Sequence, residues 1–240
     1  MSLKLSIGID GLANLVSLQL RNNFGLNGDD DCAKLDDAID FAVARVESCF
    51  GRINNKYYSD STGRTIFDPF HSCQYTTFLY YLSRRLGEQR PSDQLAAKVY
   101  YLNKMLNGCD LFHAIELPDV FFMEHPMASV MGRAKYSNYF AFQQGCTVGG
   151  NRDAFGVVHY PVLGEYVWMF ANATVIGRSR IGDNVFLAAG AYVKDTNVPD
   201  NTIVFGQSPE LVLKTLPAEF FYARSPFREH HERLSRPAAA

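Results

Sequence analysis

The stretch LGEYVWMFANATVIGRSRIGDNVFLAAGAYVK, residues 163–194, repeats with a period of six residues. Helices and ordinary strands do not have this period, because side chains recur about every 3.6 residues on a helix and about every two along a strand. A hexapeptide repeat instead indicates a parallel β-helix, whose stacked coils bury one another's apolar positions. The first position of each repeat is apolar, and the fifth is mostly small. These positions are Leu163, Met169, Val175, Ile181, Leu187 and Val193, and then Val167, Ala173, Ser179, Val185 and Ala191.

The six-residue period is also present, less regularly, before residue 163, and it is interrupted once. Residues 149–161, GGNRDAFGVVHYP, break the period, and we expect them to project as a loop. Before residue 109 the pattern is helical, with helices expected over 33–50, 74–86 and 93–106, the first capped by Asp29–Asp31. The fold class is therefore α+β. We expect a helical N-terminal domain (1–108), a β-helix domain (109–206) and a C-terminal tail (207–240) whose short polar helix carries His230 and His231 on the surface.

Bulk composition excludes several function classes. The 240 residues carry a formal net charge of −2 and show no basic stripe, so we expect no nucleic-acid partner. No apolar run reaches the roughly 18 residues that a membrane-spanning helix needs, and the N-terminus lacks the features of a signal peptide. The five cysteines are scattered and odd in number, which favours reduced thiols and a cytoplasmic protein.

Several spacings in the β-helix region are more specific than the repeat itself. In CDLFHAIELPDVFFMEH (109–125), Asp110 stands fifteen residues before His125, and Glu124 directly precedes this histidine. The turn CTVGG (146–150) follows, and His159 stands nine residues after Gly150. From Asp110 to about Lys214 the chain resembles serine acetyltransferases and other hexapeptide acyltransferases. The resemblance implies a left-handed β-helix and acyl transfer from acetyl-CoA or another acyl-CoA, with no metal required.

The resemblance also implies roles for individual residues. His125 is the expected general base, Asp110 the carboxylate that orients its ring, and His159 a second active-site histidine that meets the oxyanion. Asp68 and Glu124 are expected to shape the acceptor pocket, although Asp68 could equally cap a helix. The expected coenzyme A contacts are Gly149, Gly150, Ala171, Ala189 and Lys214.

One position departs from the family. Serine acetyltransferases have an arginine directly before the second histidine, where this chain has Val158. A valine cannot form the bidentate pair that a guanidinium gives a carboxylate. This change favours an acceptor other than serine, and we expect a hydroxyl or amino group of a small molecule such as a sugar or sugar nucleotide.

Other interpretations remain open. The chain could be a serine O-acetyltransferase of cysteine biosynthesis, a non-catalytic scaffold, or a metal-dependent protein of the carbonic-anhydrase type. The last would need three closely placed histidines, and His113, His125 and His159 do not have that spacing. The resemblance further implies a homotrimer or a dimer of trimers, in which each site combines His125 of one chain with His159 of the next.

Overall fold

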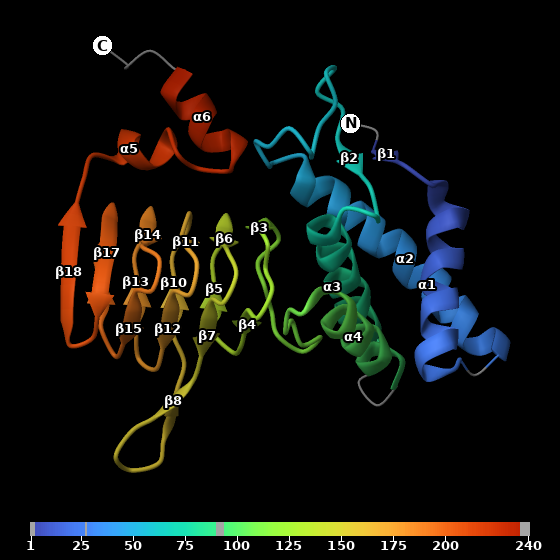
Figure 1. Ribbon diagram of the computed structural model, residues 1–240, viewed down its shortest axis with the longest axis horizontal. Coiled ribbons are helices and arrows are strands. Elements are labelled where there is room, and N and C mark those ends of the chain that lie inside the picture. Colours follow the sequence, from blue (N-terminus) through green and yellow to red (C-terminus); the bar gives the residue numbers. More distant parts are fainter. Residues whose placement is uncertain (1–2, 27, 90–93, 236–240) are drawn as a thin grey trace. The chain divides into compact units, whose positions relative to one another are not determined.

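The computed structural model describes residues 3–26, 28–89 and 94–235 (Figure 1). They form two compact units: a helical unit up to Gly51 together with Asn55–Ile115, and a β unit of Arg52–Asn54 together with the residues from Glu116 onward. The predicted fold class, a helical region followed by a parallel β-helix, is confirmed. Within the described ranges, no helix is long and apolar enough to cross a membrane.

The described residues of the helical unit form four helices and a short parallel strand pair. Its elements are β1 (Lys4–Leu5), α1 (Gly8–Phe24), α2 (Gly28–Phe50), β2 (Ile66–Phe67), α3 (Ser72–Gln89) and α4 (Gln94–Asn107). The three predicted helices are confirmed as α2, α3 and α4; Asp93, at the start of the third prediction, lies outside the described residues. The helix α1 is additional.

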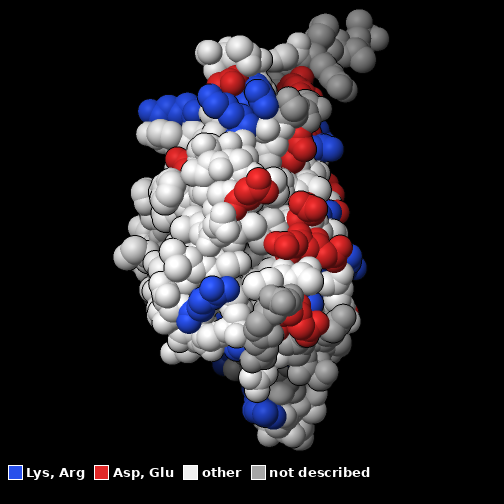
Figure 2. Space-filling view, turned by 90° about the vertical axis from the view of Figure 1, so that its right-hand side faces the viewer, with Lys and Arg blue, Asp and Glu red and all other residues white. Residues whose placement is uncertain are grey.

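The first two helices differ from the expectation in detail. Helix α1 buries Leu12, Val16 and Leu20, which are four residues apart and therefore share one face. Helix α2 begins before its predicted caps, so Asp30 lies in its first turn, where it pairs with Lys34 at 2.6 Å. Figure 2 shows acidic side chains grouped on the face that is drawn there.

Helix α3 is buried along most of its length, from Cys73 to Ser83. Its buried hydroxyls find acceptors within the same helix: Thr76 donates to the carbonyl of Ser72, and Thr77 donates to that of Cys73. A largely buried helix can carry these two threonines because each hydroxyl is hydrogen-bonded.

The β unit is a coil with three faces. Strands of the first face are β5 (Lys135–Tyr136), β10 (Val162–Leu163), β13 (Arg180–Ile181) and β16 (Asn197–Val198). Strands of the second face are β3 (Phe121–Met123), β6 (Phe140–Phe142), β11 (Trp168–Met169) and β14 (Val185–Leu187). Strands of the third face are β4 (Val130–Met131), β7 (Thr147–Gly149), β12 (Thr174–Ile176) and β15 (Tyr192–Lys194). Strand β17 (Thr202–Gln207) continues from β14 and also reaches β15.

The register explains the six-residue period. Val162 pairs with Arg180, and Trp168 pairs with Phe186, each 18 residues on. One coil is therefore three hexapeptides, one for each face. The first position of each repeat lies in the core, with exposed fractions from 0% for Leu163 to 4% for Ile181. The small residues of the fifth position are equally buried, as expected for the inside of a tight turn.

The predicted interruption is a β-hairpin inserted into one coil. Across it, Lys135 pairs with Val162, a spacing of 27 residues that is nine more than the regular 18. The extra residues form β8 (Asn151–Arg152) and β9 (Val158–His159), which pair antiparallel and project from the coil (Figure 1).

Where a strand of the first or third face ends, a glycine repeatedly sits against the next coil. The Asp200 carboxylate accepts the backbone N–H of Asp183 at 2.8 Å, directly beside Gly182, and Asp195 does the same for Arg178 beside Gly177. A side chain at the glycine would occupy the space of that carboxylate. These glycines allow the coils to stack closely.

We predict that Gly182→Ala destabilises the β unit. Its new Cβ would lie 2.7 Å from the backbone nitrogen of Asp200 and 2.9 Å from the carbonyl carbon of Pro199, so backbone must move. Such overpacking costs about 1–3 kcal/mol, which thermal unfolding can measure. Gly149→Ala is the matched control, because its Cβ would meet no atom within 4 Å; an equal loss in both variants would contradict this account.

The C-terminal segment packs on the β unit. Strand β18 (Glu210–Thr215) pairs antiparallel with β17, and α5 (Ala218–Tyr222) and α6 (Arg228–Ser235) follow. Helix α6 is the predicted polar helix, but the predicted surface position of His230 is wrong. Its ring is 1% exposed and stacks on Tyr166, with ring centres 3.5 Å apart. Within the described residues, neither ring nitrogen of His230 has a hydrogen-bond partner.

Burial lowers the pKa of His230 from 6.5 to about 3, and the nearby Arg233 and His231 act in the same direction. The folded protein therefore holds this ring neutral. The unfolded chain binds a proton below pH 6.5, so stability is complete above that pH and falls as the pH drops toward 3.

We predict that unfolding free energy falls by on the order of 1–2 kcal/mol between pH 7 and pH 5, and that His230→Phe removes this part of the dependence. Denaturant unfolding at the two pH values measures it. His231→Gln is the control, because His231 is only partly buried and uses its Nε2 on the carbonyl of Ser225. If His230→Phe kept the full slope, the slope would have another origin.

Candidate active site

His125 lies on the turn that joins the second face to the third, in the first complete coil. This turn, with its equivalents at 143–146, 170–173 and 188–191, is called the His125 corner. The backbone of His125 is left-handed, with φ 47°, and its carbonyl accepts the N–H of Met127 at 2.7 Å. A non-glycine residue is held in this conformation only by the structure around it. The His125 side chain is exposed at the corner.

Ala171 and Ala189 belong to the same corner, one coil apart. The N–H of Gly190 donates to the carbonyl of Ala171 at 2.9 Å, which fixes the alignment of these two coils. Neither alanine is buried. Alanine side chains at these two positions add little bulk to the outer surface of the corner.

Glu124 is held by a residue that the sequence did not single out. The Gln143 amide donates to the Glu124 carboxylate at 3.1 Å, and its oxygen accepts the N–H of Ala171 at 3.1 Å. One side chain therefore links the coils of Glu124, Gln143 and Ala171. No spacing marks Gln143 in the sequence, because its role depends on the 19-residue and 28-residue steps between coils.

His159 lies elsewhere in the β unit. It ends β9 of the inserted hairpin, at the turn that joins the third face to the first. A single chain therefore presents His125 and His159 at two different corners. Gly149 ends β7, and Gly150 follows with no room for a side chain, since a Cβ there would lie 2.7 Å from the ring of Tyr160.

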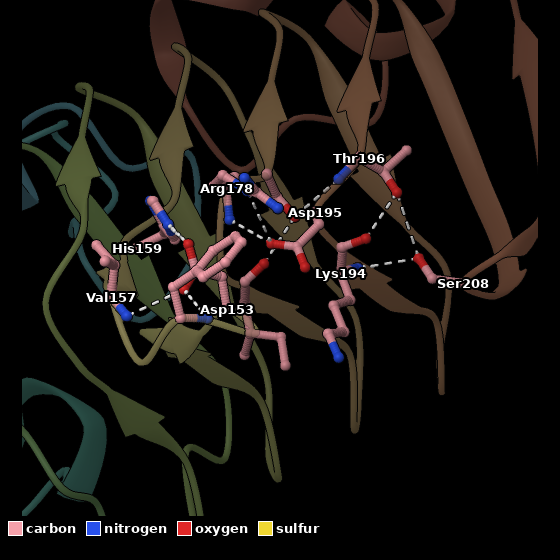
Figure 3. A network of polar contacts seen from close by, with 11 residues as sticks. Asp153, Val157, His159, Arg178, Lys194, Asp195, Thr196 and Ser208 are labelled. Atoms are coloured by element: carbon pink, nitrogen blue, oxygen red, sulfur yellow. Dashed lines mark hydrogen bonds and ion pairs between the residues drawn. The ribbon is translucent and has the colours of Figure 1, made fainter.

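The His159 ring has a carboxylate partner that was also not predicted. His159 Nε2 lies 2.9 Å from Asp153 Oδ2 (Figure 3). The hydrogen bond from His159 is the main reason why the pKa of Asp153 lies below its usual value, and backbone N–H groups of Val157 and Phe155 add to it. Lys214, by contrast, is an exposed residue of β18, opposite Ile203.

Asp110 and Asp68 belong to the helical unit. Asp110 accepts hydrogen bonds from the Tyr100 hydroxyl at 2.8 Å and from Lys104 Nζ at 2.6 Å. This carboxylate raises the pKa of Lys104, and it adds to the effect of burial in raising the pKa of Tyr100. Because His125 belongs to the β unit, the pairing of Asp110 with His125 stays a prediction.

Asp68 does not cap α3 (Ser72–Gln89), because the groups that its carboxylate binds lie outside that helix. Its Oδ1 accepts the backbone N–H of Phe70 at 3.1 Å and the hydroxyl of Ser6 at 2.9 Å, just before α3 begins. This arrangement stabilises the turn. Both bonds use the same carboxylate oxygen, Oδ1.

The main cavity found among the described residues of the β unit lies away from these residues. This open cavity of about 640 Å³ has a polar lining and contains none of the predicted site residues. It is lined by Glu116, Leu117, Pro118, Asp119, Ala134, Lys135, Tyr136, Ser137, Asn138 and Glu165. Among the described residues, no group of three or more His, Cys, Asp or Glu side chains is arranged to hold a metal ion.

Fold and corner residues together define a hexapeptide-repeat β-helix protein with a helical N-terminal region. The curated proteins that this chain matches are serine acetyltransferases, which confirms the resemblance seen in the sequence. The chain is 34% identical over 107 residues to the serine acetyltransferase of Synechococcus elongatus, covering 44% of this chain and 43% of the relative. It is 27% identical over 131 residues to that of Mycobacterium tuberculosis, covering 54% and 56%. The chain thus spans about half the length of these curated relatives. No family model matches it.

Solved structures agree on the fold over a longer stretch. The crystal structure of Neisseria gonorrhoeae serine acetyltransferase matches with a TM-score of 0.65 at 21% identity, over 88% of this chain and 81% of that one. A serine acetyltransferase in complex with CoA matches with a TM-score of 0.65 at 16% identity, over 85% and 84%. Another was solved in complex with cysteine, with a TM-score of 0.64 at 18% identity, over 87% and 80%. At these identities the likeness concerns the fold.

Proposed function

We propose that the protein is an acetyl-CoA-dependent O-acetyltransferase whose acceptor is L-serine or a close analogue. The observation that carries this proposal is the exposed His125 at a corner whose next coils are lined by Ala171 and Ala189. The CoA complex of a structural relative supports acetyl-CoA as the donor. Because the relatives reported above are serine acetyltransferases, they favour serine over the sugar acceptor that Val158 suggested.

In this mechanism His125 removes the proton of the serine hydroxyl as its oxygen attacks the thioester carbonyl. The tetrahedral intermediate collapses with cleavage of the carbon–sulfur bond, and the protonated His125 returns its proton to the leaving thiolate. Asp110 orients the ring of His125. His159 and the backbone near Gly149 and Gly150 interact with the reacting groups from the other side.

A serine acceptor needs a cation for its carboxylate, and the hairpin offers one. Arg152 of β8 pairs directly with Val158 of β9, so the two side chains leave the hairpin on the same face. One N–H of its guanidinium donates to the carbonyl of Gly156 at 2.8 Å, and the side chain is otherwise exposed. Arg152 can thus replace the arginine that the family has at position 158.

The proposed assembly rests on the positions of the two corners. Since His125 and His159 lie at different corners of one chain, a common site requires two chains. We propose a homotrimer, or a dimer of trimers, in which the donor groove runs between neighbouring chains. The cytoplasmic location predicted from the cysteines stays a prediction.

The acceptor is tested by following CoA thiol release with a thiol-reactive dye. With acetyl-CoA as donor, we expect L-serine to support turnover and amino-sugar nucleotides to support little. Arg152→Gln is expected to raise the KM for serine about tenfold or more, because a carboxylate loses its charged partner, while the KM for acetyl-CoA is kept. Turnover with the sugar nucleotide alone would overturn the serine assignment and retain the transferase.

The general base is tested by substitution. His125→Ala is expected to lower kcat by about 10²-fold or more, as expected for loss of a general base. Asp110→Asn is expected to have a smaller but measurable effect, because it disturbs orientation and leaves the base in place. His231→Gln, in the C-terminal helix, serves as control. Wild-type turnover in His125→Ala and Asp110→Asn would refute the pair.

A further inference from the structure

The hairpin that presents His159 also carries the carboxylate that holds its ring. We propose that Asp153 is a positioning residue, which fixes the tautomer and the orientation of His159 in the acetyl transfer. This inference rests on the proposed function for its catalytic consequence. Its structural part, the position of one proton on one ring, can be measured without any turnover.

Asp153 has little freedom, because the turn of the hairpin holds it. Residues 153–156 form a tight turn in which the Gly156 N–H donates to the Asp153 carbonyl at 3.0 Å, with Gly156 at φ 83°. The Asp153 Oδ1 atom accepts the N–H groups of Phe155 at 2.9 Å and Val157 at 3.0 Å. With Oδ1 occupied by the backbone, Oδ2 is the oxygen directed at the His159 ring (Figure 3).

The charge of Asp153 decides where the imidazole proton sits. Hydrogen bonds from His159, Val157 and Phe155 hold the pKa of Asp153 below its usual value, so the group is a carboxylate at neutral pH. A carboxylate only accepts hydrogen bonds. The Nε2 atom that lies 2.9 Å from it must therefore carry the proton in the neutral ring, which leaves Nδ1 unprotonated.

This tautomer determines what His159 can offer to a substrate. Its side chain is 29% exposed, against 17% for Asp153, and within the described residues Nδ1 has no hydrogen-bond partner. In the neutral ring, Nδ1 accepts a hydrogen bond from the hydroxyl or ammonium group of the acceptor. Only the doubly protonated ring donates from Nδ1 to an oxyanion. Asp153 thus assigns His159 to acceptor binding before chemistry begins.

Asp153→Asn is the informative variant, because it keeps the hydrogen bonds of the hairpin turn and changes only the group that faces the His159 ring. The asparagine oxygen can still accept the N–H groups of Phe155 and Val157, so the hairpin is kept. Its NH₂ group then faces Nε2 and donates to it, which moves the ring proton to Nδ1. Asp195→Asn is the matched control. Asp195 also accepts a backbone N–H, from Arg178 at 2.7 Å, and it has no histidine partner.

The first measurement is nitrogen NMR of the full chain with ¹⁵N-labelled histidine, with His159→Ala to assign the signal. We expect the proton on Nε2 in the wild type and in Asp195→Asn, and on Nδ1 in Asp153→Asn. A wild-type ring protonated on Nδ1, or an Asp153→Asn ring unchanged from wild type, would overturn the proposal. This result does not depend on whether the protein transfers acetyl groups.

The second measurement is acetyl transfer to serine. We expect Asp153→Asn to raise the KM for the acceptor and lower kcat/KM roughly tenfold to a hundredfold, with the KM for acetyl-CoA kept. The double variant Asp153→Asn, His159→Ala should lose no more kcat/KM than His159→Ala alone, because Asp153 acts only through His159. Additive losses would overturn the positioning role. Wild-type protein inactive toward every acceptor would refute the proposed function, while the proton position would still test Asp153.

Discussion

The backbone hydrogen bonds between successive coils are the constraint on which the rest of this structure depends. They place each residue of the regular region over the residue 18 positions away, as Val162 over Arg180. A slip of one residue would turn every buried side chain outward. The same register stacks Ala171 on Ala189. Two other steps between coils, of 19 and 28 residues, bring Gln143 between Glu124 and Ala171. The spacing of the buried apolar residues therefore sets which side chains meet at the His125 corner, although those apolar residues take no part in the chemistry.

Regularity of this kind leaves two ways to present a functional side chain. One is an exposed corner residue, as at His125, whose left-handed backbone carries a cost in strain. The other is an insertion, as in the hairpin of His159, which is free of the coil's period and can supply its own partner. Under the proposed function the corner histidine takes its carboxylate from outside its own coil, whereas the hairpin histidine has Asp153 six residues away.

The periodic pattern of the sequence predicted the coil and its interruption, but it did not predict contacts between residues far apart or irregularly spaced in the chain. Six apolar positions in a row were enough for the β-helix, and the interrupted period located the hairpin. Handedness has no signature in the period and came from resemblance. The roles of Gln143 and Asp153 were not predicted, because their contacts join residues at separations that do not match the repeat. His230 was misjudged because it lies in a polar helix; the ring that covers it, Tyr166, is 64 residues away in the chain.

Asp110 and Asp153, the two carboxylates proposed as histidine partners, have different hydrogen-bond donors around them. Lys104 and Tyr100 bind Asp110 within the helical unit, so part of its negative charge is compensated there. A carboxylate in such a pair still has lone pairs to accept from an imidazole, but it gives less electrostatic stabilisation to the imidazolium. Asp153 is bound by neutral backbone N–H groups and retains its full charge toward His159. Under the proposed function, Asp110 therefore contributes orientation more than charge, and the stronger ionic partner belongs to the histidine that binds the acceptor.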